Sequence, residues 1–463
     1  MRKITAHSVW IFVIAFFLAA SVQQAPASSA GIISVGISTG DDKAAFSAKS
    51  APLTLTGASG ESATFKSPVQ VALSSSGIVS AGSAKLKLPV TIQSTGLIYW
   101  NNRPYRGHFR LVGEGRGFNV VNVIGVEDYL KGVLKMEVNP VWPMESLKAQ
   151  AIIARTYAFR SRNKHGASGF DLCATDHCQV YRGVNAEDPT LSEAVDSTRG
   201  MVLKYQGSYA ATFYHADSGG HTANVASVWG SSIPYLQGKP EPIQYESPYS
   251  RWLTTLRLSE IQRVLYSKDI KIGDLTALEI SSTDRAGRAE TITLKGTAGI
   301  VTIKSSQFRT FMGNDRIRST FFTIVESSPS VPPQTRTISS PAVSGNEPVP
   351  LTPQDEQLLI SLTQKGVFTS EELMDMLLRP ERRSIHLKKA LERQSGCTTL
   401  VLAAPALKAP ASAGDAITFS GRGWGHGVGM SQWGAKSLAE SGWDHCRILQ
   451  HYFPGTSMEK VTY

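Results

Sequence analysis

The sequence predicts an α+β fold with three parts: a β-rich N-terminal region, a mixed α/β core and a small helical insert. Over residues 31–118, short runs that alternate apolar and polar side chains are separated by Gly and Ser, which is typical of β-strands. Residues 119–326 mix such runs with helical segments, which favours a core built of both. The chain has 463 residues, 41% of them hydrophobic, enough to bury the cores of two or three domains.

Residues 1–30 are predicted to form an export signal. Basic residues at positions 2 and 3 precede an apolar run over residues 9–22, and small residues follow, with cleavage expected near Ala27 or Ala30. The run is shorter than the roughly 20 apolar residues of a membrane-spanning helix, which makes an uncleaved membrane anchor the less favoured alternative. We therefore expect an exported protein, in the periplasm or at the cell wall. The net charge of +10 then favours an anionic wall polymer over nucleic acid as its partner.

Individual elements follow from local patterns. In the N-terminal region, residues 33–38, 69–73 and 86–90 are predicted strands, because apolar residues occupy every second position. In the core, residues 145–162 are a predicted helix, since apolar side chains recur at helical spacing. Pro143 marks its start, and a carboxylate in the first turn suits the helix dipole.

Residues 327–350 are predicted to be an extended linker, because Ser, Pro, Thr and Gln dominate them. The following residues, 351–415, are expected to form the small helical insert. Thr352 and Thr369 each precede an acid by three positions, which is the sequence pattern of a capped helix start. Residues 416–463 are a final Gly-rich part that we expect to complete the core.

The Gly-rich stretch over residues 420–435, SGRGWGHGVGMSQWGA, allows three interpretations. A phosphate-binding loop is disfavoured, because the stretch lacks the Lys-Ser/Thr pair of a P-loop and does not follow a βαβ unit. A tight surface turn is the simplest alternative. Sugar binding fits best, since glycines permit close backbone approach to a ligand while Trp424, His426 and Trp433 can stack and hydrogen-bond.

Four motifs follow one another along the chain: VNVIGVEDYLKGVLKMEVNPVWPMESLKAQAIIARTYAF, CQVYRG, YHADSGGHT and GRGWGHGVGMSQWGAKSLAESG. Together they resemble the SpoIID/LytB domain family, over about residues 105–325 and 418–463. The resemblance implies a peptidoglycan lytic transglycosylase that acts on glycan strands stripped of their stem peptides, or, as in a second branch of the family, an enhancer of a cell-wall amidase. The insert separates the last motif from the others, which leaves the choice of partner and substrate open.

Glu137 is a single carboxylate within the first of these motifs. The resemblance implies that it is the acid–base residue of a lytic transglycosylase. A protonated Glu can donate to the glycosidic oxygen and then accept the proton of the sugar's C6 hydroxyl, which closes a 1,6-anhydro ring without water. Apolar neighbours on both sides would keep such an acid protonated near neutral pH. The alternative is a structural salt bridge with Arg155 or Lys148.

The resemblance also implies a group of residues that contact the glycan, drawn mainly from the third and fourth motifs. They are Arg155, Tyr214, His215, Ser218, Gly219, Gly220, Thr222, His426, Ser431 and Gln432. Taken singly, the polar residues of the third motif also fit a surface turn. A Ser218-His215-Asp217 triad is disfavoured, because residues so close in one turn cannot face one another in the required order.

One loop holds three predicted zinc ligands, Cys173, His177 and Cys178, and His165 is expected to be the fourth. Thiolates and imidazoles suit tetrahedral Zn²⁺, and the resemblance supports zinc because some members hold it at the matching loop. The alternative is a Cys173–Cys178 disulfide, since an exported protein meets oxidising conditions. A metal here is expected to be structural.

The other two cysteines, Cys397 and Cys446, lie in the insert and in the last part of the chain. In an oxidising compartment they could pair with each other. Such a disulfide would tie the insert to the final motif.

Overall fold

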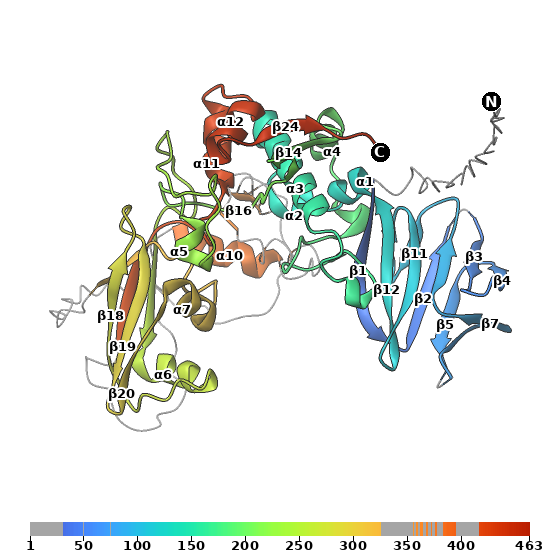
Figure 1. The fold of residues 1–463 in the computed structure, drawn as a ribbon, viewed down its shortest axis with the longest axis horizontal. Helices are drawn as coiled ribbons and strands as arrows, with labels where there is room; N and C mark the ends of the chain where they lie inside the picture. Colours follow the sequence, from blue (N-terminus) through green and yellow to red (C-terminus); the bar gives the residue numbers. More distant parts are fainter. Residues whose placement is uncertain are drawn as a thin grey trace, which may run out of the picture. The chain divides into compact units, whose positions relative to one another are not determined.

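The computed structural model describes residues 31–49, 51–74, 76–325 and 416–463, and parts of 355–394 (Figure 1). The predicted export signal, the linker, the helix starts at Thr352 and Thr369, and Cys397 lie outside the described residues. The α+β prediction is confirmed, because β-sheets dominate the N-terminal part and helices and strands alternate after it.

The chain divides into two compact units. The first comprises Met1–Tyr129, Arg162–Asn185 and Lys460–Tyr463, and the second comprises Leu130–Ser161 and Ala186–Glu459. The first passage of the chain from one unit to the other falls within helix α1 (Val126–Lys131). No helix in the described part of the chain combines the length and the apolar character that a membrane crossing requires.

Two β-sheets build the first unit. The seven-stranded sheet has the order β13-β1-β12-β11-β8-β3-β4, and the six-stranded sheet has the order β10-β9-β2-β5-β6-β7. The strands of the larger sheet are β1 (Ile32–Asp41), β3 (Leu53–Thr56), β4 (Ser62–Phe65), β8 (Val90–Gln93), β11 (His108–Glu114), β12 (Gly117–Gly125) and β13 (Leu172–Cys173). Those of the smaller sheet are β2 (Lys43–Ala48), β5 (Val69–Leu73), β6 (Ile78–Ala81), β7 (Ala84–Lys87), β9 (Ile98–Trp100) and β10 (Arg103–Tyr105).

The core of the first unit lies between these sheets. The rings of Phe46 in β2 and Phe109 in β11 are buried, with 5.2 Å between their centroids, so the two sheets pack against each other. The strands predicted over residues 33–38 and 69–73 are confirmed as β1 and β5. The single strand predicted over residues 86–90 is wrong: it is divided between β7 and β8 at Pro89, which has no N–H for a sheet ladder.

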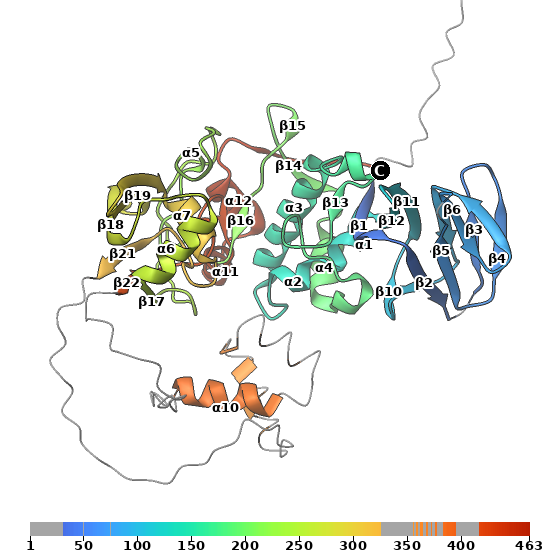
Figure 2. The ribbon, with the colours of Figure 1, turned by 90° about the horizontal axis from the view of Figure 1, so that it is seen from below.

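Helix α3 (Met144–Arg160) is the centre of the second unit and confirms the helix predicted over residues 145–162. Most of its side chains are buried, and α4 (Pro189–Ser197) lies beside it (Figure 2). The short helix α2 (Leu134–Glu137) precedes α3 in the chain. The elements packed around α3 are β14 (Met201–Tyr205), β15 (Ser208–Tyr209), β16 (Tyr214–His215), α5 (Val225–Trp229), β23 (Met430–Ser431), α11 (Gln432–Glu440), α12 (His445–Tyr452) and β24 (Ser457–Lys460). Residues from the two ends of the unit's sequence thus share one apolar core.

A second apolar cluster of this unit is built on two three-stranded sheets, ordered β17-β22-β21 and β18-β19-β20. The elements are β17 (Trp252–Arg257), α6 (Leu258–Ser267), β18 (Leu275–Thr283), β19 (Ala289–Gly296), β20 (Gly299–Lys304), α7 (Ser305–Met312), β21 (Phe322–Val325) and β22 (Ala416–Gly421). Strands β21 and β22 flank the insert in sequence and pair directly, with Val325 opposite Thr418. The described segments on either side of the linker and insert therefore lie side by side.

Part of the predicted helical insert is described. Helix α10 (Arg383–Gln394) contributes Leu387 and Ala390 to a small buried cluster with Leu362, Phe368 and Met376. All members of this cluster come from the insert, which gives it an apolar core of its own.

Candidate active site

Glu137 is the last residue of the short helix α2. The helix ends because Val138 is extended, and the buried side chains of Leu134 and Val138 fix the segment against the core. A turn follows, in which Asn139 accepts hydrogen bonds from the backbone N–H groups of Val141, at 3.1 Å, and Trp142, at 3.1 Å. Glu137 therefore lies where α2 meets the hydrogen-bonded turn that leads into α3.

The environment of Glu137 favours its neutral form. The residue is half-buried, and burial raises its pKa to about 7, although a hydrogen bond from Tyr214 acts in the opposite direction. Among the described residues, no charged side chain contributes to this change. Near neutral pH the carboxyl group is therefore present in comparable amounts of its acid and base forms.

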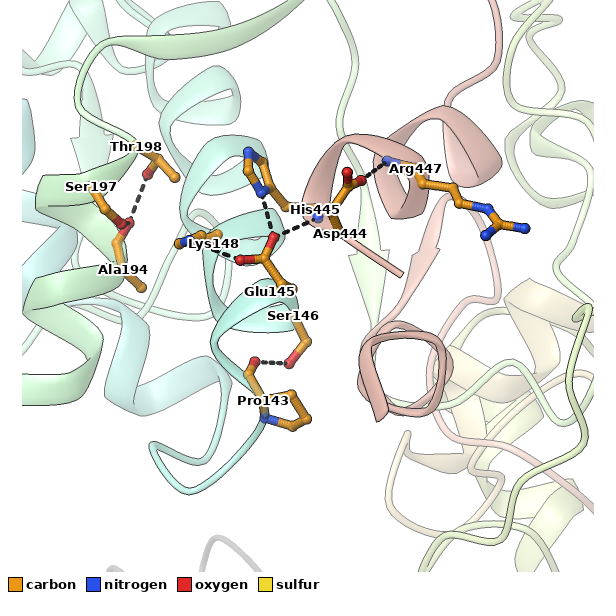
Figure 3. A network of polar contacts seen from close by, with 10 residues as sticks. All are labelled: Pro143, Glu145, Ser146, Lys148, Ala194, Ser197, Thr198, Asp444, His445 and Arg447. Atoms are coloured by element: carbon orange, nitrogen blue, oxygen red, sulfur yellow. Dashed lines mark hydrogen bonds and ion pairs between the residues drawn. The ribbon is translucent and has the colours of Figure 1, made fainter. Parts of the chain in front are cut away.

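The two predicted salt-bridge partners of Glu137 have other contacts. Lys148 donates to Glu145 at 2.8 Å, and His445 at the start of α12 contacts the same carboxylate through Nδ1 at 2.6 Å (Figure 3). Burial acts against it, but these hydrogen bonds lower the pKa of Glu145 to about 2. Glu145 thus ties α12 to the first turn of α3.

Arg155 is fully buried in α3. Its guanidinium donates to the backbone oxygens of Val195, at 3.0 Å, and Met201, at 3.1 Å, and so fastens α3 to the end of α4. These contacts are structural, and the glycan contact expected of Arg155 stays a prediction.

The third and fourth motifs meet in a short parallel pairing. Strands β16 and β23 place Tyr214 opposite Met430 and His215 opposite Ser431. His215 Nδ1 lies 3.2 Å from the Val428 oxygen, and the Val428 N–H donates to His426 Nδ1 at 3.0 Å. Burial lowers the pKa of His426 to about 3 and that of His215 well below its ordinary value, so both imidazoles are neutral at physiological pH.

Asp217 and Ser218 belong to a buried hydrogen-bond network. Asp217 accepts from the Gly219 N–H at 2.7 Å, from the Tyr245 hydroxyl at 3.1 Å and from the Ser247 hydroxyl. Ser431 Oγ accepts from the Ser218 N–H at 3.2 Å and lies 2.9 Å from the Tyr245 oxygen. The third motif is thereby locked to the fourth.

Glu241 closes this network, and sequence reasoning missed it. One carboxylate oxygen accepts from Ser218 at 2.7 Å and the other from Tyr452 at 2.6 Å. Burial raises the pKa of Glu241 to about 7. Neither Glu241 nor Tyr452 lies in a quoted motif, so no sequence signal pointed to them.

The remaining predicted residues lie in the same region. Thr222 Oγ1 accepts from the Lys239 N–H at 3.0 Å, and the Gln432 amide faces Gln150 at 3.5 Å. Gly219 and Gly220 both have positive φ angles, which glycine adopts without strain. Ser218, His215 and Asp217 each hydrogen-bond to groups other than one another, which agrees with the prediction that they do not form a catalytic triad.

The four predicted metal ligands come together in the first unit. The ligand atoms of His165, Cys173, His177 and Cys178 all lie within 4.8 Å of one another. His165 Nε2 is 3.4 Å from Cys178 Sγ, and His177 Nδ1 is 3.6 Å from each sulfur. A tetrahedral ion with Zn–S of about 2.3 Å and Zn–N of about 2.0–2.1 Å would separate sulfur from nitrogen by roughly 3.6 Å. The donor set therefore fits a metal.

The thiols of this cluster are free. The structure thus favours the metal interpretation over the Cys173–Cys178 disulfide that the sequence left open. Cys446 is an exposed free thiol, and its predicted partner Cys397 lies outside the described residues.

A family model described as "SpoIID: Stage II sporulation protein" matches residues 114–205. The chain carries a SpoIID-family domain. The matched residues, 114–205, include Glu137, Arg155 and the four metal-ligand candidates. The predicted resemblance is confirmed.

Curated relatives extend the similarity beyond that domain. An uncharacterized protein of Brachyspira hyodysenteriae is 33% identical over 225 residues, which are 48% of this chain and 60% of that protein. The amidase enhancer of Bacillus subtilis is 30% identical over 340 residues, 71% of this chain and 40% of that protein. Stage II sporulation protein D of Bacillus subtilis is 31% identical over 160 residues, 31% of this chain and 47% of that protein. The chain thus spans between 40% and 60% of the length of these relatives.

Proposed function

We propose that the protein is a peptidoglycan lytic transglycosylase that cleaves MurNAc–GlcNAc bonds in glycan strands free of stem peptides. The products would end in 1,6-anhydro-MurNAc. The observation that carries this proposal is the single half-buried acid Glu137, whose pKa of about 7 suits a group that must first donate and then accept a proton.

The chemistry follows from the surroundings of Glu137. Its protonated form donates to the glycosidic oxygen, and the C1–O bond breaks. The resulting carboxylate accepts the proton of the C6 hydroxyl as O6 bonds to C1, so no water is consumed. A hydrolase ordinarily needs a second carboxylate, whereas this route uses one acid that serves in turn as proton donor and proton acceptor. The hydrogen bond with Tyr214 orients the carboxyl group.

The predicted glycan-binding residues support this reaction by hydrogen bonding. Because His215 and His426 are neutral, they contact a substrate as dipoles rather than as cations. Their neighbours Ser218 and Ser431 are held in place by the network around Asp217. Such fixed polar groups bind an acetamido sugar without reorganising during the reaction.

We also propose that the cluster of His165, Cys173, His177 and Cys178 holds a structural Zn²⁺. Four protein ligands complete a tetrahedral shell and leave no position for substrate. The ion would fix this loop of the first unit. An exported location at the cell wall follows from the proposed substrate and from the predicted signal.

A second candidate function is a non-catalytic glycan-binding enhancer of a cell-wall amidase. The observation in its favour is the similarity to a protein named amidase enhancer, which covers 71% of this chain. The insert, with its own apolar cluster, would be the surface available to a partner.

Digestion of purified peptide-free glycan strands, with products analysed by mass spectrometry, tests the choice. Products with 1,6-anhydro ends support the transglycosylase. Intact strands together with faster amidase turnover would support the enhancer instead.

A further inference from the structure

Two tryptophans from distant parts of the sequence meet beside Glu137. Trp142 lies in the turn that follows α2, and Trp433 lies in the first turn of α11. Their ring centroids are 5.2 Å apart at an interplanar angle of 65°. Both rings are half-buried, and Val141, next to Trp142, is 72% exposed, so this edge of the second unit is open to solvent.

Two hydrogen bonds connect the pair to Glu137 through the segment that leaves strand β16 (Tyr214–His215). Tyr214 hydrogen-bonds to Glu137, and the backbone N–H of Trp433 donates to the backbone oxygen of Ala216 at 3.0 Å. Tyr214 and Ala216 are two residues apart in a segment that leaves strand β16, a separation of about 7 Å along an extended backbone. The two hydrogen bonds thus link Trp433 to Glu137 through one short segment.

Trp433 is held by contacts with two side chains, whereas the Trp142 ring has fewer contacts. Lys436 places its ammonium group 5.3 Å from the Trp433 centroid and is itself anchored to Glu440 at 2.5 Å. Apart from Trp433, no ring and no cation of the described residues contacts the Trp142 ring, and its indole N–H has no hydrogen-bond partner among them. A partly exposed ring with a spare donor is a suitable platform for a pyranose, whose C–H groups pack on the negative face of an aromatic ring.

We propose that Trp142, braced by Trp433, is a stacking subsite for the sugar ring adjacent to the bond held at Glu137. This inference rests on the proposed glycan substrate. It adds the residue that fixes the position of the glycan chain relative to Glu137. Trp142 touches the sugar and takes no part in proton transfer. Its loss should therefore weaken glycan binding and raise KM.

The test measures binding without turnover. In the Glu137→Gln protein, the Kd of a peptide-free tetrasaccharide, two GlcNAc–MurNAc repeats, is determined by calorimetry with and without Trp142→Ala. We expect a loss of about tenfold, the size typical of an aromatic anchor in a binding site. Trp443→Ala is the matched control, because Trp443 is also half-buried in this unit but its ring is covered by Arg447 at 3.8 Å. It should leave the Kd unchanged.

A second measurement does not depend on the folding of the Ala variant. In Glu137→Gln protein labelled with 5-fluorotryptophan, the Trp142 resonance, assigned with Trp142→Phe, should shift on saturation with the tetrasaccharide, while that of Trp443 stays in place. An unchanged Trp142 resonance, or an equal Kd in a folded Trp142→Ala protein, overturns the subsite and leaves the transglycosylase proposal intact. Binding that depends on Trp142 in a wild-type protein that cuts no glycan upholds the subsite and overturns the transglycosylase.

Discussion

Replacing Glu137 with Gln should strongly slow cleavage and, at alkaline pH, make the protein more stable. Gln keeps the shape of the side chain and can still contact Tyr214, but it cannot exchange a proton. General acid–base catalysis contributes about 10²–10⁴ in rate, which corresponds to about 3–5 kcal/mol of activation free energy. The loss should appear in kcat, while the Kd for glycan stays within a factor of about two.

The stability effect follows from the pKa of Glu137, which burial raises from its ordinary value of 4.5 to about 7. The folded protein holds this proton more tightly than the unfolded chain, so the free energy of unfolding falls as pH rises from about 4.5 to about 7. At about 1.4 kcal/mol per pKa unit, the full cost above pH 7 is about 3 kcal/mol, which the partial exposure of Glu137 reduces. Gln does not ionise, so the variant escapes this cost above pH 7 and gains nothing below pH 4.5.

Two assays check the reasoning. Turnover of peptide-free glycan, followed by mass spectrometry of 1,6-anhydro products, should fall in the wild type as pH rises above about 7, because the acid form of Glu137 is lost. Urea unfolding at pH 4 and pH 8 should show the variant stabilised only at pH 8. Wild-type turnover in the Gln variant would refute the catalytic role, and destabilisation at pH 8 would refute the assignment of an acid whose pKa burial raises.

Three other predictions concern the rest of the chain. Purified protein should contain about one equivalent of zinc; Cys173→Ser should lose it and lower the unfolding midpoint, whereas a metal-free protein with a disulfide at this loop would contradict the site. Deleting residues 352–393 should leave a folded protein that still cleaves glycan, because the insert has its own apolar cluster and its flanking strands pair with each other; loss of folding, seen by circular dichroism, would make the insert part of the main core. Gly434→Ala should cost about 1–3 kcal/mol of unfolding free energy, because the new Cβ would lie 2.2 Å from the Tyr452 hydroxyl and 2.8 Å from Glu241 Oε2; an unchanged urea midpoint would show that this hydrogen bond is dispensable.

Local patterns in the sequence predict most of the elements and suggest the chemistry of single residues. Alternation identified β1 and β5, and helical spacing identified α3, because the burial of one face repeats with the period of the element. Glu137 and the metal ligands stand in short motifs whose residue types suggest acid–base catalysis and metal binding. The alternating pattern over residues 86–90 did not give one continuous strand, because Pro89 has no N–H to donate to a neighbouring strand.

Which distant residues are in contact depends on the tertiary fold. Tyr452 and Glu241 are 211 residues apart and close the network at Ser218, and Trp433 reaches Trp142 only because α11 packs on α3. It also placed Arg155, a predicted glycan contact, in full burial against the end of α4. A periodic pattern reports that a face is covered but carries no information about which segment covers it, and the pKa of Glu137 depends on that cover.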